Sequence, residues 1–277
     1  MNFLTTSRTT RLQRTIASLC LLAFPVAAFA ASKPQPAASS ADASATTAFV
    51  HVSVIPMDAN HLLSDQTVLV RGDRIVSVGP ASGVKVPAGA TSIDATGQYI
   101  IPGFAASHAH VDSQSDFQSY LASGVTTVFG LDGSSAPWRD QIATGKLLGP
   151  TLYSTTDAKV SQPANADATG AALQQMLQQQ VRSGRTPYQA LQSVTVTPAK
   201  ELHASREFGT VTKGSRADLV LLSANPLANI SNTQRIAGVM VRGHWIPQSE
   251  LQLIHVSRLT QPQHELQVTY VNGDGSM

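Results

Sequence analysis

The chain has 277 residues, of which 42% are hydrophobic and 13% are charged, and its formal net charge is +2. This composition is typical of a folded protein with one large domain or two small ones. Three arginines lie within the first 14 residues, and no basic stripe with interleaved aromatic residues follows. The composition therefore gives no indication of a nucleic-acid partner.

The N-terminus has the pattern of a secretory signal peptide. Basic residues precede an apolar run over residues 16–29, and residues 28–30 (Ala-Phe-Ala) have the small-x-small form of a cleavage site. We expect residues 1–30 to be removed by cleavage after Ala30, which predicts a periplasmic or secreted protein without stable membrane insertion. An uncleaved anchor is the alternative. Cys20 is the single cysteine, so the mature chain would form no disulfide.

Residues 31–47 are rich in Ala, Ser, Pro and Thr, which predicts a disordered linker. Residues 48–100 then contain short runs of β-branched residues separated by turn signals. Residues 71–74 (Arg-Gly-Asp-Arg) predict a tight hairpin turn, because glycine and aspartate tolerate positive φ. The strands expected here are residues 50–55, 67–71, 74–78 and 92–94.

The same strand character returns over residues 209–250, where we expect strands at residues 209–211, 217–222 and 236–245. Each sheet has an apolar face to bury, so we expect the two regions to be the halves of a small β-sandwich built from both chain ends. Asp218 lies in this part, and we expect it to be structural. Residues 251–277 have the composition of a loosely held tail.

Between the two halves, residues 101–208 alternate strands with helices, which is the pattern of a parallel α/β barrel. The predicted fold class is therefore α/β plus β, a partial (β/α) barrel with a small sandwich. The first expected strand is the apolar run that ends in residues 108–110, and further strands are expected over residues 125–131 and 149–157. Expected helices cover residues 117–122, 138–144 and 171–182, and two more begin at Thr186-Pro187 and Thr197-Pro198.

The first of these strands ends in His108-x-His110. Side chains two apart on an extended backbone point the same way, so both imidazoles can bind one metal ion. Imidazole suits zinc, and a catalytic zinc ion typically takes three protein ligands and leaves one position to water. A His-x-His pair also occurs by chance. The pair therefore predicts half of a metal site.

An ordered set of motifs extends this pattern. Residues 100–110 read Ile-Ile-Pro-Gly-Phe-Ala-Ala-Ser-His-Ala-His, and residues 213–222 read Lys-Gly-Ser-Arg-Ala-Asp-Leu-Val-Leu-Leu. Together they resemble the metal-dependent amidohydrolase superfamily, in its imidazolonepropionase-like and prolidase-like branch. The other matching segments are residues 52–58, 68–79, 124–128, 148–153, 186–191, 197–199, 208–211, 225–227 and 230–236.

The resemblance implies an eight-stranded α/β barrel beside a sandwich, with one or two divalent metals at the barrel mouth. It implies hydrolysis of a carbon–nitrogen bond in a small-molecule amide, cyclic amide or dipeptide by metal-activated water. On the matching positions, His108 and His110 are metal ligands, and zinc is the expected metal.

The resemblance also implies a role for Asp157, because residues 155–158 (Thr-Thr-Asp-Ala) are similar to the end of the family's last barrel strand. There Asp157 would be a third metal ligand and the catalytic base that takes the proton of the water. In the alternative, residues 149–154 form an early barrel strand and Asp157 is a turn or cap residue. If Asp157 is a ligand, its strand should lie beside the strand that precedes His108.

A complete barrel takes about 250 residues, far more than residues 101–208 provide. We therefore predict an internally truncated member that lacks several family ligands. Two functions stay open: a metal-dependent C–N hydrolase, and a catalytically inactive remnant that at most binds a metal or a partner. Because a partial barrel leaves open strand edges and an uncovered apolar face, we expect a homo-oligomer that covers them.

Overall fold

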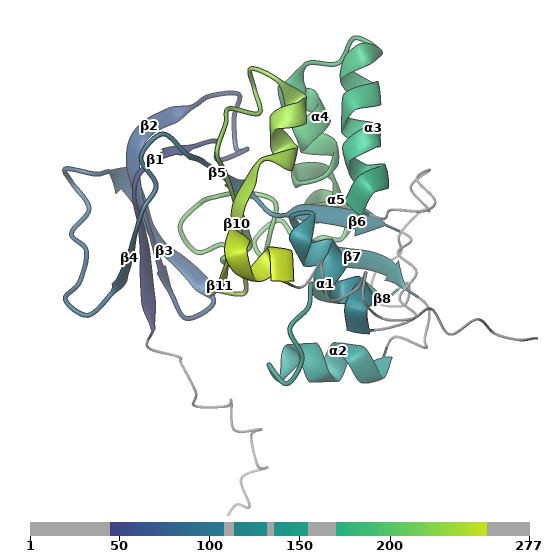
Figure 1. Cartoon of the computed structure of the whole chain (residues 1–277), viewed down its shortest axis with the longest axis horizontal. Coiled ribbons are helices and arrows are strands. Elements are labelled where there is room, and N and C mark those ends of the chain that lie inside the picture. The colour runs from purple at the N-terminus through teal and green to yellow at the C-terminus, as the bar shows by residue number, and fades with distance from the viewer. Residues whose placement is uncertain (1–44, 108–113, 132–135, 155–169, 254–277) are drawn as a thin grey trace, which may run out of the picture. The chain divides into compact units, whose positions relative to one another are not determined.

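Strands from both ends of the described chain share one eight-stranded sheet (Figure 1). The computed structural model describes residues 45–107, 114–131, 136–154 and 170–253. The N-terminal strands are β1 (Thr46–Val54), β2 (Leu63–Arg71), β3 (Arg74–Pro80), β4 (Thr91–Asp94) and β5 (Tyr99–Pro102). The C-terminal strands are β9 (Leu219–Leu222), β10 (Ile236–Val241) and β11 (His244–Pro247).

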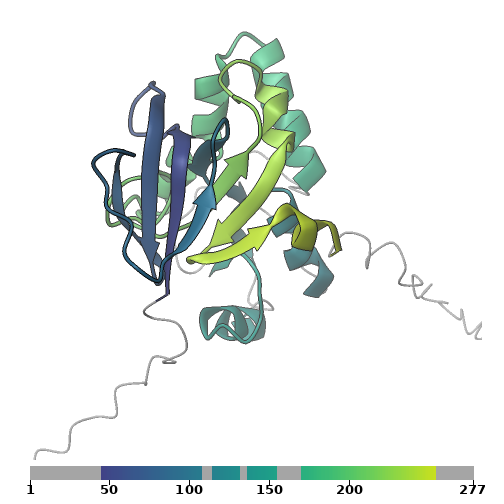
Figure 2. The same cartoon turned by 60° about the vertical axis from the view of Figure 1, so that its left-hand side comes forward.

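The strand order is β11-β10-β9-β5-β1-β2-β3, and β4 also pairs with β1. The two chain ends meet where β5 pairs antiparallel with β9. The two sheets expected from the sequence are therefore one hydrogen-bonded sheet, which we call the composite sheet. Figure 2 shows its N-terminal strands, in purple and blue, beside its C-terminal strands, in yellow-green.

Both halves of the composite sheet bury side chains in a common core. Phe49 and Val68 from the N-terminal half lie in one cluster with Leu221 and Met240 from the C-terminal half. The rings of Phe49 and Trp245 meet edge to face, with their centroids 5.0 Å apart. Burial of side chains of this size stabilises the fold by about 1.5–3 kcal/mol each. The halves thus stabilise each other although they are far apart in sequence.

Two glycine-containing turns close the hairpins of the composite sheet. The turn predicted at residues 71–74 is confirmed, with Arg71 opposite Arg74 and a φ of 56° at Gly72. The single strand predicted over residues 236–245 is wrong, because Arg242 and Gly243 have φ values of 48° and 78°. Consecutive positive φ values form a tight hairpin turn, which divides this stretch into β10 and β11.

The strand predicted at residues 209–211 is also wrong, since these residues lie in no strand. Gly209 has a φ of 94° and packs so closely on the preceding helix that an added Cβ would lie 2.9 Å from the Cβ of Ala199. The backbone here follows the helix surface instead of a neighbouring strand.

A second sheet has three parallel strands in the order β6-β7-β8: β6 (Phe104–Ser107), β7 (Val125–Leu131) and β8 (Thr151–Ser154). Helix α1 (Gln114–Ala122) connects β6 to β7, and α2 (Ala136–Ala143) connects β7 to β8. Gly124, with a φ of 81°, ends the α1 segment and its amide donates to the carbonyl of Leu121. The predicted succession of strand, helix and strand is confirmed.

The next helices are α3 (Gly170–Arg182), α4 (Pro187–Ser193) and α5 (Val196–Glu201), followed later by the short 3₁₀ helix η2 (Ile230–Gln234). Thr186 caps α4 in a reciprocal pair with Gln189, as predicted. The predicted start of α5 at Thr197 is wrong. The helix follows Thr195, whose hydroxyl donates back to the Leu191 carbonyl at 2.7 Å and makes no cap.

One face of the three-stranded sheet packs on helices and on the composite sheet. A single buried cluster contains Phe104 of β6, Val128 of β7, Leu121 of α1, Leu177 of α3 and Val239 of β10. This shared core joins the two sheets. In the described ranges, no helix is both long and apolar enough to cross a bilayer.

The close approach of the two hairpin turns gives a stability prediction. A Cβ on Gly243 would collide with the carbonyl oxygen of Gly72, and the φ of 78° already favours glycine. We expect Gly243→Ala to lower the free energy of unfolding by about 2–4 kcal/mol. Gly184→Ala is the matched control, because its φ is 96° but nothing lies within 4 Å of the added Cβ. It should cost about 1 kcal/mol. Equal urea midpoints for the two variants would contradict the predicted collision.

Candidate functional site

The predicted site residues His108, His110 and Asp157 lie outside the described residues, but the strands that lead to them are described. Strand β6 ends at Ser107, directly before His108, and β8 ends at Ser154. Because β6, β7 and β8 are parallel, their carboxyl ends lie at one edge of the sheet. In α/β sheets, this is the edge at which ligands bind.

Strand β8 is not the neighbour of β6, because β7 lies between them and pairs with both. Adjacent strands are about 4.8 Å apart, so the axes of β6 and β8 are about 10 Å apart. The described strands therefore do not meet the condition set for Asp157 as a ligand. Their order follows the chain, as expected if residues 149–154 are an early barrel strand.

The three predicted donors suit zinc in type and number, since two imidazoles and a carboxylate are a common catalytic set. Among the residues of the described ranges, no group of three or more His, Cys, Asp or Glu side chains could hold a metal ion.

The other face of the three-stranded sheet, opposite the helices α1 and α3, is covered by α5 and the segment after it. The buried cluster on this face contains Ala105, Phe129, Ala199, Leu202, Ala204 and Phe208. The rings of Tyr153 and Phe208 have their centroids 6.1 Å apart, and the Ala105 amide donates to the Val194 carbonyl at 2.8 Å. We expected an uncovered apolar face on a partial barrel. Among the described residues, this face of the three-stranded sheet is covered.

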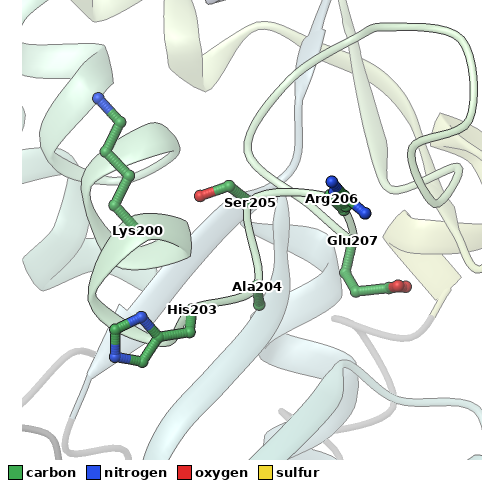
Figure 3. A pocket seen from close by; sticks show the side chains of 6 residues that line it. All are labelled: Lys200, His203, Ala204, Ser205, Arg206 and Glu207. Carbon is green, nitrogen blue, oxygen red and sulfur yellow. The ribbon is translucent and has the colours of Figure 1, made fainter.

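A polar pocket lies at the end of α5 (Figure 3). It is lined by Lys200, His203, Ala204, Ser205, Arg206 and Glu207. Lys200, His203 and Arg206 are exposed and point in different directions, while Glu207 pairs with Arg74 at 2.8 Å. Because these side chains do not converge on one point, the pocket lacks the geometry of a catalytic centre.

A buried ion pair lies where the composite sheet meets β8. Arg216 Nε and Nη2 both lie 2.6 Å from Asp218 Oδ2, and the two side chains are only 8% and 1% exposed. Burial lowers the pKa of Arg216, but the charge and hydrogen bonds of Asp218, with a contribution from Tyr153, raise it above its ordinary value. The expected structural role of Asp218 agrees with this burial.

Arg242 extends the ion pair to β8. Its backbone amide donates to Asp218 Oδ1 at 2.8 Å, and its Nη1 donates to the carbonyl of Gly149 at 3.1 Å and to Thr151 Oγ1 at 3.3 Å. Burial lowers the pKa of Arg242, although Asp218 acts in the opposite direction. Sequence reasoning missed both arginines, because nothing in their spacing indicates a shared carboxylate.

The chain matches one family model, the amidohydrolase family, over residues 120–246. It is 39% identical over 72 residues to an adenine deaminase of Rubrobacter xylanophilus, a match that covers 26% of this chain and 12% of that protein. It is 27% identical over 175 residues to an imidazolonepropionase of Streptomyces griseus, covering 60% of this chain and 40% of that protein. The chain thus spans less than half the length of these curated relatives.

Solved structures share the fold at low identity. A molinate hydrolase superposes with a TM-score of 0.66 at 14% identity, over 76% of this chain and 96% of that one. A putative prolidase from Bifidobacterium longum superposes with a TM-score of 0.62 at 15% identity, over 79% and 100% of the two chains. At these identities, the similarity concerns the fold alone.

Two buried hydroxyls of β7 give a prediction about the centre of the three-stranded sheet. Thr126 Oγ1 and Thr127 Oγ1 have no hydrogen-bond partner among the described residues. A buried, unsatisfied polar group costs about 1–3 kcal/mol, so Thr127→Val should leave stability unchanged or raise it by about 1 kcal/mol.

The matched control is Thr195→Val, which removes a fully buried hydroxyl that does have an acceptor, the Leu191 carbonyl. It should lower the free energy of unfolding by about 1 kcal/mol. Both variants are compared by urea denaturation. A loss in Thr127→Val as large as in the control would mean that the Thr127 hydroxyl has a partner in solution.

Proposed function

The chain belongs to the metal-dependent amidohydrolase superfamily, and on that basis we propose that it hydrolyses carbon–nitrogen bonds in small-molecule amides. In this proposal, a divalent metal is bound by His108 and His110 at the carboxyl edge of the three-stranded sheet. The observation that carries it is the position of β6. This strand is the first of a parallel set and ends at Ser107, directly before the two histidines.

The proposed metal is zinc. His108 and His110 would hold it through ring nitrogens, and Asp157 is the proposed third ligand and the acceptor of the proton from water. A divalent metal bound there supplies two effects, a lower pKa for its bound water and polarisation of the substrate carbonyl. Because the axes of β6 and β8 are about 10 Å apart, the segment after β8 would have to bring the Asp157 carboxylate back towards the histidines.

The three parallel strands also fit the alternative, in which they are early strands of a truncated barrel and Asp157 is a turn or cap residue. In support, β6, β7 and β8 follow one another in chain order with a helix in each connection. The names of the curated relatives, adenine deaminase and imidazolonepropionase, support small nitrogen-containing ring compounds as the substrate class. The N-terminal segment supports a periplasmic or secreted location.

The second candidate is a catalytically inactive remnant, and the strand order favours it. With β7 between β6 and β8, the described strands do not place Asp157 next to the histidines. A metal site that lacks its third ligand and its supporting hydrogen bonds binds metal weakly and activates water poorly. A second copy of the chain that paired with an open strand edge could complete such a site, which keeps the homo-oligomer as a proposal.

Metal binding separates the two candidates. We expect the mature chain to bind about one zinc ion per chain, since a catalytic site takes three protein ligands and one water. The His108→Ala/His110→Ala double variant should lose it. Zinc content after gel filtration measures the zinc bound per chain, and a competition titration measures the affinity. Both are compared between the unmodified chain and the double variant.

The matched control is His203→Ala/His244→Ala, which removes two exposed histidines and should keep the zinc. An unmodified mature chain without zinc would contradict the hydrolase and favour the remnant. Equal zinc loss in both double variants would show that the predicted pair is not the site.

A further inference from the structure

Asp218 contacts the three-stranded sheet at two places. Its backbone carbonyl accepts a hydrogen bond from the amide of Gly103 at 2.8 Å, and Gly103 immediately precedes β6. Its side chain binds the two arginines, one of which reaches β8. Asp218, a single buried residue directly before β9, is therefore connected to β6 and β8, the outer strands of the three-stranded sheet.

The contacts on β8 lie on one face of that strand. Arg242 Nη1 donates to Thr151 Oγ1 at 3.3 Å. Tyr153 lies two residues further along, and it contributes to the raised pKa of Arg216. Residues two apart in a strand point to the same side, so Thr151, which Arg242 contacts, and Tyr153 lie on the same face of β8. Strand β8 is also the end of the sheet order, so among the described strands it has a neighbour on one side only.

The geometry of Arg242 is fixed by its own backbone. Its φ of 48° lies in the left-handed region, which a residue with a Cβ adopts at a cost. The amide of this residue is directed at Asp218 Oδ1 in that conformation. The carboxylate therefore sets both the turn and the direction from which the guanidinium reaches β8.

We propose that Asp218, Arg216 and Arg242 form a positioning cluster that fixes β8 relative to β6. The cluster joins the composite sheet to the starts of β6 and β8 through polar contacts, in addition to the shared apolar core and the pairing of both strands with β7. Its consequence for metal binding rests on the proposed function, because the histidines follow β6 and Asp157 follows β8. The position of β8 itself does not depend on that function.

The direct test compares Arg242→Met with Arg242→Lys and Arg71→Met in the full mature chain. Methionine keeps much of the apolar stem of Arg242 but cannot donate to Gly149 and Thr151. Lysine keeps the charge and a donating ammonium group, but not the planar fork of the guanidinium. Arg71 is an exposed arginine at the end of β2, outside the cluster, so its variant controls for loss of a positive charge. Asp218→Asn is avoided as the first variant, because it would leave the buried Arg216 guanidinium without its carboxylate, which strongly destabilises a fold.

Amide hydrogen exchange is the readout that separates positioning from general stability. In Arg242→Met we expect exchange in β8 to accelerate about tenfold, with β1, β2 and β3 unchanged. Arg242→Lys should recover part of the protection, and Arg71→Met should match the unmodified chain. Unchanged exchange in β8 would overturn the proposal, and so would an equal acceleration in every strand, which indicates a purely global effect.

Zinc affinity is measured on the same variants. If the proposed function holds, Arg242→Met should weaken zinc binding by about tenfold or more, as loss of a residue that orients a metal ligand does. If the unmodified chain binds no zinc, the proposed function fails, while the exchange result in β8 still decides the positioning cluster. Unchanged zinc affinity together with accelerated exchange in β8 would overturn the link between β8 and the metal site.

Discussion

The buried carboxylate of Asp218 needs an opposite charge and hydrogen-bond donors, and much of this structure depends on the residues that supply them. A charge that is only 1% exposed must be paired and hydrogen-bonded, because an unpaired buried charge costs several kcal/mol. Arg216 supplies the opposite charge from the same segment, and Arg242 supplies a backbone donor from the β10–β11 turn. The turn is therefore held in a left-handed conformation, and Gly243 must follow because its neighbour Gly72 leaves no space for a side chain.

The three-stranded parallel sheet meets a second constraint with segments of the same chain. A three-stranded parallel sheet needs cover on both faces, because βαβ connections place helices on one face only here. Helix α5 and Phe208 occupy the other face, and the carbonyl of Val194 accepts from the first part of β6. Cover of the sheet faces thus does not by itself require a second copy of the chain. In the described part of the chain, the reason left for an oligomer is the outer edges of β6 and β8, whose strand partner there is β7.

Local chemistry made part of the fold predictable from sequence. The hairpin at residues 71–74, the cap at Thr186 and the strand–helix–strand order each depend on residues close together in the chain. The start of α5 was not predictable, because Thr195 uses its hydroxyl on the preceding helix instead of capping. The Arg242 contacts with β8 join residues about 90 apart in the chain, and no sequence period indicates such a pair.

The two family motifs, residues 213–222 and the pair His108 and His110, differ in what they indicate about activity. The motif at residues 213–222 is accounted for by the composite sheet and the Asp218 cluster, which need β6 and β8 but none of the strands a full barrel would add. A role in folding is therefore sufficient to explain the motif, and it carries no argument for activity. The pair His108 and His110 has a different status, since two imidazoles after a parallel strand contribute little to a fold but suit a metal. The hydrolase proposal therefore rests on the edge after β6, and the position of β7 between β6 and β8 is the argument for the remnant.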